Sequence, residues 1–124
     1  MKRVLVIDDE DGIRNLIRFS LEALTDWEVL TAGSGMEGLA IAQDRMPDAI
    51  LLDVMMPDLD GIATFQQLQL DPILQTIPTV FLTAKASATE RDELIALGAV
   101  GAISKPFKAK MLVDRIKLCL GWND

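Results

Sequence analysis

The sequence predicts an α/β domain in which a parallel sheet lies between two layers of helices, and two observations support this prediction. Short apolar runs alternate five times with longer amphipathic stretches along the 124 residues. The strongest runs are unbroken, which is typical of strands buried on both faces. Alternation of strand and helix with short connections implies right-handed crossovers and a parallel sheet. No linker or repeat interrupts the pattern, so residues 1–124 are expected to form one domain.

Five strands are expected, of which three are strong. The runs at 4–7, 49–52 and 79–82 are apolar, rich in β-branched residues and bounded by charged residues, Gly or Pro. Two weaker candidates, Glu28–Ala32 and 100–104, contain fewer apolar residues and are predicted to be the edge strands.

A helix is expected after each strand. Ile13, Leu16, Ile17, Leu21 and Leu24 recur at the spacing of one helical face and predict the first helix. The third is expected at Gly61–Leu70, with Ile62, Phe65 and Leu68 facing inward, and the fifth at 108–120, with Leu112, Ile116, Cys119 and Leu120 aligned.

Capping boxes mark the starts of the second and fourth helices. Ser34 followed by Glu37 predicts a helix that runs to about Met46, and Ser87 followed by Glu90 predicts one that ends at Gly98.

Composition excludes several classes of function. The net charge of −7 disfavours nucleic-acid binding by this domain alone, because acidic surfaces repel the phosphate backbone. No apolar run approaches the roughly 20 residues of a membrane span, and no signal peptide is evident, so a cytoplasmic location is expected. The chain has no histidine, which rules out histidine-dependent catalysis and histidine-ligated zinc. The single cysteine, Cys119, is expected to be a buried core residue.

Polar residues with complementary chemistry follow the predicted strands. Asp8 and Asp9 come after the first, Asp53 after the third, Thr83 after the fourth and Lys105 after the fifth. Each alone has an ordinary explanation as a helix cap, a turn residue or a solvated charge. Their joint placement favours a site, because ligands of open α/β sheets bind beyond the carboxyl ends of the strands.

The chemistry of these groups fits together. Three clustered carboxylates repel one another and favour a hard divalent cation, Mg²⁺ or Mn²⁺. A carboxylate can attack phosphorus to form an acyl phosphate, with charge support from the metal and Lys105. Thr83 could then donate a hydrogen bond to the new phosphoryl group.

The motifs VLVIDDE, ILLDVMMPDLDG, VFLTA and SKPF, in this order, resemble those of the receiver domains of bacterial response regulators over the whole chain. The resemblance implies a flavodoxin-like (βα)5 fold with strand order 2-1-3-4-5. It implies that Asp53 is the phosphoacceptor and that Asp8, Asp9, Asp53 and the backbone carbonyl of Met55 hold Mg²⁺. By the same resemblance Thr83 is the switch hydroxyl and Lys105 pairs with the phosphoryl group.

The resemblance also implies a cis bond between Lys105 and Pro106, and it assigns Pro57 and Gly61 to the loop after the acceptor. One position departs from the family pattern, since Ala102 stands where many receivers carry Tyr or Phe. An alanine has no rotamer to switch, so signalling is expected to rest on the segment 84–88 and the fourth helix. The sequence VGA at 100–102 also lacks the paired acids that serve dimer contacts in winged-helix regulators.

The expected function is phosphorelay signalling without enzymatic turnover of a substrate. A sensor histidine kinase or phosphotransfer protein would donate the phosphoryl group, and the output would be a protein contact through the fourth helix, fifth strand and fifth helix. The chain could act alone or be excised from a longer regulator. Met55 and Lys85, two residues beyond Asp53 and Thr83, are predicted to limit access of hydrolytic water.

Two alternatives stay open and a third is excluded. A degenerate receiver would bind partners without phosphorylation. An aspartyl-phosphate-forming phosphatase is disfavoured, because Met55 stands where such enzymes favour a second acid. An electron carrier fails on the acidic first turn, DDEDG, where a flavin phosphate would need amides and hydroxyls.

Overall fold

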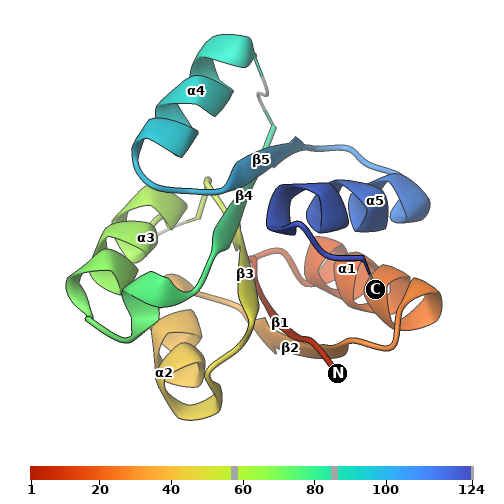
Figure 1. Ribbon diagram of the computed structural model, residues 1–124, viewed down its shortest axis with the longest axis horizontal. Helices are drawn as coiled ribbons and strands as arrows, with labels where there is room; N and C mark the ends of the chain where they lie inside the picture. Colours follow the sequence, from red (N-terminus) through yellow and green to blue (C-terminus); the bar gives the residue numbers. More distant parts are fainter. Residues whose placement is uncertain (57–58, 85–86, 124) are drawn as a thin grey trace.

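A five-stranded parallel sheet forms the centre of the protein, with helices on both of its faces (Figure 1). The structure is a computed structural model, and it describes residues 1–56, 59–84 and 87–123. The strands are β1 (Arg3–Ile7), β2 (Glu28–Ala32), β3 (Ala49–Asp53), β4 (Thr79–Thr83) and β5 (Gly101–Ser104). Their order is β2-β1-β3-β4-β5 and every neighbouring pair is parallel. The predicted fold class, strand order and edge strands are confirmed.

Helices α1 (Asp11–Leu24) and α5 (Ala109–Leu120) cover one face of the sheet, and α2 (Gly35–Arg45), α3 (Gly61–Leu70) and α4 (Ala88–Ala96) cover the other. A short 3-10 helix, η1 (Leu74–Thr76), precedes β4 and has no counterpart among the elements that the sequence predicts. No helix in the described part of the chain has the length and apolar character needed to cross a bilayer.

The three inner strands are buried on both faces, as the unbroken apolar runs predict. In β1, Leu5 and Ile7 pack toward α2 and α3, whereas Val4 and Val6 pack toward α1 and α5. Strands β3 and β4 each run one residue further than expected, so that Asp53 and Thr83 are their last residues. The side chains of the site are therefore fixed by the sheet itself.

The two serines cap α2 and α4 as expected, but the described residues show no return bond from either glutamate to its serine amide, because Glu37 accepts from the amide of Gly33 and Glu90 from Thr83. Ser34 accepts a hydrogen bond from the amide of Glu37 at 3.1 Å, and Ser87 accepts one from the amide of Glu90 at 3.1 Å. Helix α4 ends slightly earlier than predicted, and Gly98 adopts a φ of 120° just beyond it. That left-handed backbone explains why glycine ends the helix.

The predicted face of the first helix is too wide. Ile17 and Leu21 are fully buried, but Leu16 and Leu24 are each 49% exposed. The sheet and α5 cover only the central line of α1, so residues at the margins of the apolar stripe stay in solvent. Cys119 is half-buried rather than buried, although it packs against the same core.

Candidate functional site

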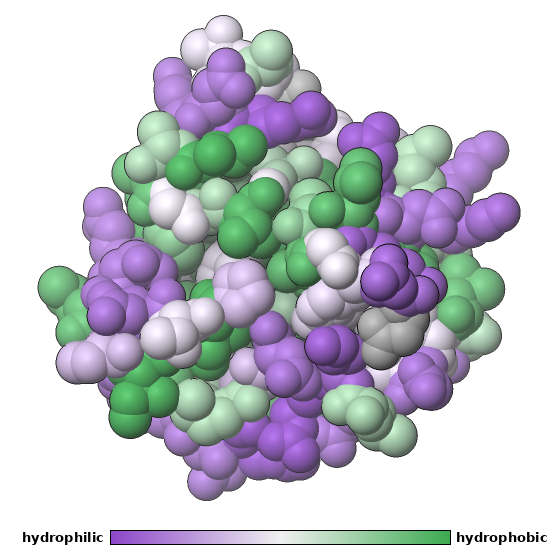
Figure 2. Space-filling view, in the orientation of Figure 1, coloured by the Kyte–Doolittle hydropathy of each residue, from purple (hydrophilic) through white to green (hydrophobic). Residues whose placement is uncertain are grey.

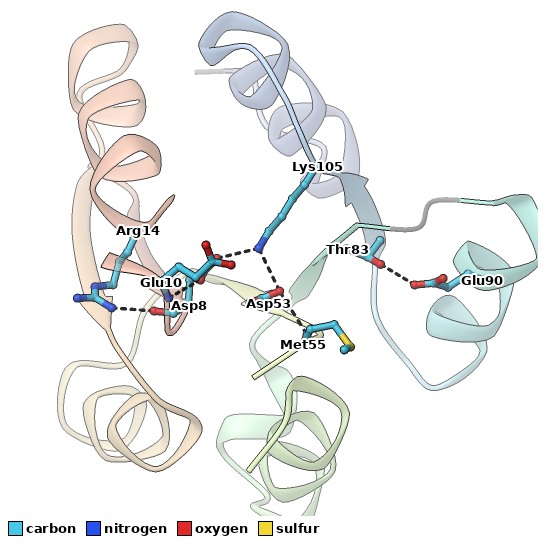
Figure 3. Close-up of polar contacts among 8 residues, drawn as sticks. All are labelled: Asp8, Glu10, Arg14, Asp53, Met55, Thr83, Glu90 and Lys105. Carbon is cyan, nitrogen blue, oxygen red and sulfur yellow. Dashed lines mark hydrogen bonds and ion pairs between the residues drawn. The ribbon is translucent and has the colours of Figure 1, made fainter. Parts of the chain in front are cut away.

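The carboxyl edge of the sheet brings together the side chains that the sequence singles out (Figure 3). Asp8 follows β1, Asp53 ends β3, and Lys105 follows β5. Their charged groups meet above the strand ends, whereas the hydroxyl of Thr83 points toward Glu90 of α4, on the side away from Asp53. Two clusters therefore share this edge.

Lys105 joins the two buried carboxylates. Its Nζ lies 3.1 Å from Oδ2 of Asp8 and 3.2 Å from Oδ1 of Asp53. Asp8 is fully buried, Asp53 is 3% exposed, and the Lys105 side chain is 16% exposed. One ammonium thus holds two carboxylates close together in a partly dry environment, which is a costly arrangement without charge compensation.

The electrostatics of this cluster raise the affinity of Asp53 for a proton. Burial and the charge of Asp8 raise the pKa of Asp53 above its usual value of 3.8, and Lys105 and the amide of Met55 only partly oppose them. For Lys105, burial lowers the pKa, but the hydrogen bonds and charges of Asp8 and Asp53 outweigh it and raise the pKa. The lysine therefore keeps its positive charge between the two carboxylates.

Backbone contacts fix Asp53 in place. The amide of Met55 donates to Oδ1 of Asp53 at 3.3 Å, and the amide of Gly61 donates to the carbonyl of Val54 at 3.0 Å. A Cβ at position 61 would lie 2.1 Å from the carbonyl oxygen of Asp53. Gly61 is therefore required by the close approach of the start of α3 to the end of β3.

Two contacts hold Asp8 in place, and the sequence analysis predicted neither of them. Its Oδ1 accepts from the amide of Glu10 at 3.0 Å, and its backbone carbonyl accepts from the Arg14 guanidinium at 2.8 Å. Arg14 also pairs with Asp11. The acidic run thus begins α1 and also contributes the amide of Glu10 that holds Asp8. No pattern in the sequence indicates the contact from Arg14.

Three carboxylates are arranged as a cation site would need. Oxygen atoms of Asp8, Asp9 and Asp53 all lie within 4.8 Å of one another. Oδ1 of Asp9 is buried and accepts no hydrogen bond from the described residues. An orphaned buried carboxylate oxygen is costly, and a hard divalent cation would satisfy it. The residues present therefore fit Mg²⁺.

Thr83 and Glu90 form the second cluster. Oγ1 of Thr83 donates to Oε1 of Glu90 at 2.5 Å. Together with Val54, Met55 and Ala84 they line a cavity of about 330 Å³ beside the carboxyl end of β3. The sequence marked Glu90 only as a capping residue, because its spacing from Thr83 across a loop carries no recognisable pattern.

The structure also places most of the remaining predicted residues. The bond between Lys105 and Pro106 is cis, as expected. Met55 is 74% exposed, with its side chain at the mouth of the site, and Ala102 is buried in β5. Pro57 and Lys85 lie outside the described residues.

Comparison with known proteins supports this arrangement. Residues 4–117 match the family model of the response regulator receiver domain. A chemotaxis protein of Vibrio cholerae superposes with a TM-score of 0.88 at 32% identity, covering 96% of this chain and 98% of that one. The receiver domain of a sensor histidine kinase of Pseudomonas aeruginosa, solved with magnesium in its active-site cleft, superposes with a TM-score of 0.84 at 25% identity, over 97% and 98% of the two chains.

Curated relatives are longer than this chain. The alkaline phosphatase synthesis transcriptional regulatory protein PhoP of Bacillus subtilis is 38% identical over 96% of this chain and 48% of its own length. The phosphate regulon transcriptional regulatory protein PhoB of Pseudomonas aeruginosa is 38% identical over 96% and 52%. The chain thus spans about half the length of these relatives.

Proposed function

The chain belongs to the family of response regulator receiver domains of two-component systems, and on this premise we propose that Asp53 accepts a phosphoryl group from a partner histidine kinase or phosphotransfer protein. We propose further that residues 1–124 act as one cytoplasmic receiver domain. It changes its protein contacts when phosphorylated, and it catalyses only its own phosphorylation and dephosphorylation. With its net charge of −7, this domain alone binds no nucleic acid.

The observation that carries the proposal is the bridge from Lys105 to Asp8 and Asp53. It places a fixed cation beside a buried carboxylate that has no catalytic histidine near it, because the chain contains none. A cation at this place can neutralise the charge that develops on a phosphoryl group as it approaches Asp53.

The proposed reaction transfers one phosphoryl group from nitrogen to oxygen, with solvent water as the source of the proton. A carboxylate oxygen of Asp53 attacks the phosphorus of the donor's phosphohistidine and forms an acyl phosphate bond. The phosphorus–nitrogen bond breaks, and its electron pair returns to the imidazole ring, which takes up a proton from solvent water. Lys105 stays protonated throughout and moves its contact from the carboxylates to a phosphoryl oxygen.

Asp8, Asp9 and Asp53, with the backbone carbonyl of Met55, are proposed to hold Mg²⁺, and Mn²⁺ has the same ligand preference. The metal would supply charge neutralisation for the transferring phosphoryl group. Asp8 and Asp9 do not contact the phosphorus in this scheme. Their role is to place the cation and, through their negative charge, to keep it bound.

The output surface is proposed to be the face formed by α4, β5 and α5. Apolar side chains gather over β5 between the two helices (Figure 2). Exposed members of this face include Ile95 and Met111, and a cavity of about 190 Å³ is lined by Arg91, Phe107 and Arg115 among others. Exposed apolar surface of this kind marks an interaction site.

The two arginines indicate the chemistry of the partner. Neither Arg91 nor Arg115 forms an ion pair with any described residue, and the Nε of Arg91 is buried without a hydrogen-bond partner among them. They stand out on a chain whose net charge is −7. A partner segment with acidic residues around an apolar anchor would satisfy both guanidinium groups.

A small-molecule phosphodonor tests the core of the proposal. Incubation with acetyl phosphate and Mg²⁺ is expected to add one phosphoryl group by intact mass, and Asp53→Asn is expected to add none. A wild-type chain that stays unmodified would favour the scaffold alternative. Phosphorylation is also expected to change amide exchange in α4 and β5 more than in α2, and equal changes would contradict the proposed output surface.

A further inference from the structure

The hydroxyl of Thr83 already has a strong acceptor before any phosphoryl group arrives. Thr83 is 3% exposed, and its Oγ1 donates to the Glu90 carboxylate at 2.5 Å. Figure 3 shows the hydroxyl directed to Glu90, with Asp53 on its other side. A hydrogen bond from a buried hydroxyl to a charged acceptor is among the stronger kinds in proteins.

We propose that Glu90 is a positioning residue, which holds the Thr83 hydroxyl away from Asp53 until phosphorylation draws it back. The inference rests on the proposed function, because it concerns the step after phosphoryl transfer. It assigns to Glu90 a role that its place in the first turn of α4 does not by itself require.

Competition for one proton makes the arrangement a switch. A threonine hydroxyl carries a single hydrogen and can donate it to only one acceptor at a time. In the resting protein that acceptor is Glu90. A phosphoryl group on Asp53 brings oxygens with up to twice the negative charge of a carboxylate, so the hydroxyl turns toward it. Every such turn leaves Glu90 without this donor.

The release of Glu90 acts on the least anchored helix. Among the described residues of α4 only Leu94 is buried, whereas α1 and α5 each bury three. A carboxylate that has lost its donor and faces a new negative charge is pushed away from the site. The next residue, Arg91, lines the cavity of the proposed output face. Movement of this first turn therefore reaches the output face directly.

Position 102, on the same side of the sheet, carries alanine where many receivers carry Tyr or Phe. Alternation along the strands places Thr83 on the side of Phe81, and Phe81 and Ala102 belong to the same core cluster, which α4 also covers. The methyl group of Ala102 has no rotamer with which to follow the hydroxyl. The cavity of about 330 Å³ lined by Thr83 and Glu90 provides the space in which both side chains can turn.

Binding of a phosphoryl analogue tests the competition. Beryllofluoride with Mg²⁺ should bind Glu90→Ala about three- to tenfold more tightly than wild type, because the hydroxyl no longer has to leave an acceptor. Glu90→Gln removes the charge but keeps an acceptor, and should fall between the two. Glu93→Ala, an exposed glutamate on the same helix, should bind like wild type. Equal affinity for wild type and Glu90→Ala, or for the two Glu90 variants, would overturn the proposal.

A second measurement does not depend on phosphoryl chemistry. A double-mutant cycle of Thr83→Val and Glu90→Ala, measured by urea unfolding without metal, should show a coupling of about five- to tenfold in the unfolding equilibrium constant. Effects that simply add would overturn the proposal. If wild type neither accepts a phosphoryl group nor binds the analogue while the coupling is present, the proposed function has failed and the contact has not.

Discussion

The two halves of the carboxyl edge are built in different ways. The half with the proposed phosphoacceptor, which we call the acceptor half, consists of Asp8, Asp53 and Lys105. These residues stand on or directly beside the ends of three strands, and their charged groups contact one another. The switch half consists of Thr83 on a strand and Glu90 on α4, a helix that buries one residue. The acceptor half is thus held by the sheet, whereas the switch half depends on how one helix sits.

This difference suggests a division of labour. Phosphoryl transfer needs charges at fixed positions, and the acceptor half, which we also call the rigid half, provides them because the sheet holds it. Signalling needs an element that can take two positions at small cost, and a lightly packed helix provides one. Changes to the acceptor half should therefore alter rates of phosphorylation, and changes to the switch half should alter the conformational response to it.

Replacement of Lys105 is the largest expected effect and the sharpest test of the rigid half. Lys105→Ala should lower the initial rate of phosphorylation by acetyl phosphate about 10²- to 10³-fold, because a fixed cation is lost from a site where negative charge gathers. Lys110→Ala, which removes an exposed lysine of α5, should leave the rate unchanged. A loss of less than about tenfold in Lys105→Ala would show that the metal alone suffices.

The sequence predicted the acceptor half because its geometry follows from strand order. Once five strands run parallel, residues that follow them must meet at one edge, and Asp8, Asp53 and Lys105 carry chemistry that is recognisable by residue type alone. The same logic placed Thr83 at the edge but left the direction of its hydroxyl open.

The switch half could not be predicted in the same way. The contact between Thr83 and Glu90 depends on the loop between β4 and α4 and on the docking of α4, neither of which leaves a periodic signal. The predicted burial of residues at the margins of α1 was wrong for a similar reason. Leu16 fits the apolar stripe of α1 but lies beyond the surface that the sheet and α5 cover. Pattern indicates which face turns inward, and packing decides how much of it is buried.

Removal of the Asp53 charge tests whether the charged form of this carboxylate lowers the free energy of unfolding. Folding raises the pKa of Asp53, through burial and the charge of Asp8, so the folded protein binds this proton more tightly than the unfolded chain does. The stability that Asp53 contributes is complete below its usual pKa of 3.8 and is lost as the pH rises through the raised pKa. At neutral pH without metal, Asp53→Asn should therefore be more stable than wild type.

Urea unfolding in the presence of a chelator measures this difference as a function of pH. The advantage of Asp53→Asn should shrink as the pH falls below the raised pKa, because the wild-type carboxyl becomes neutral too. Addition of Mg²⁺ should stabilise wild type more than the variant. If wild type is the more stable of the two at pH 7 without metal, the charged form of Asp53 does not destabilise the folded protein, and the prediction is wrong.

The smallest expected effect lies at the border of the two halves, where Met55 is 74% exposed and lines the cavity shared with Thr83 and Glu90. Met55 lines the cavity beside the carboxyl end of β3, so water that hydrolyses the proposed acyl phosphate is expected to approach phosphorus past this side chain. Met55→Asn shortens the side chain and adds an amide that can hold a water, so loss of the phosphoryl group should speed up about threefold. Met36→Asn, at an exposed methionine of α2, is the matched control. If the two variants lose the phosphoryl group at the wild-type rate, access of water is set by the rigid half alone, and the border between the halves lies beyond Met55.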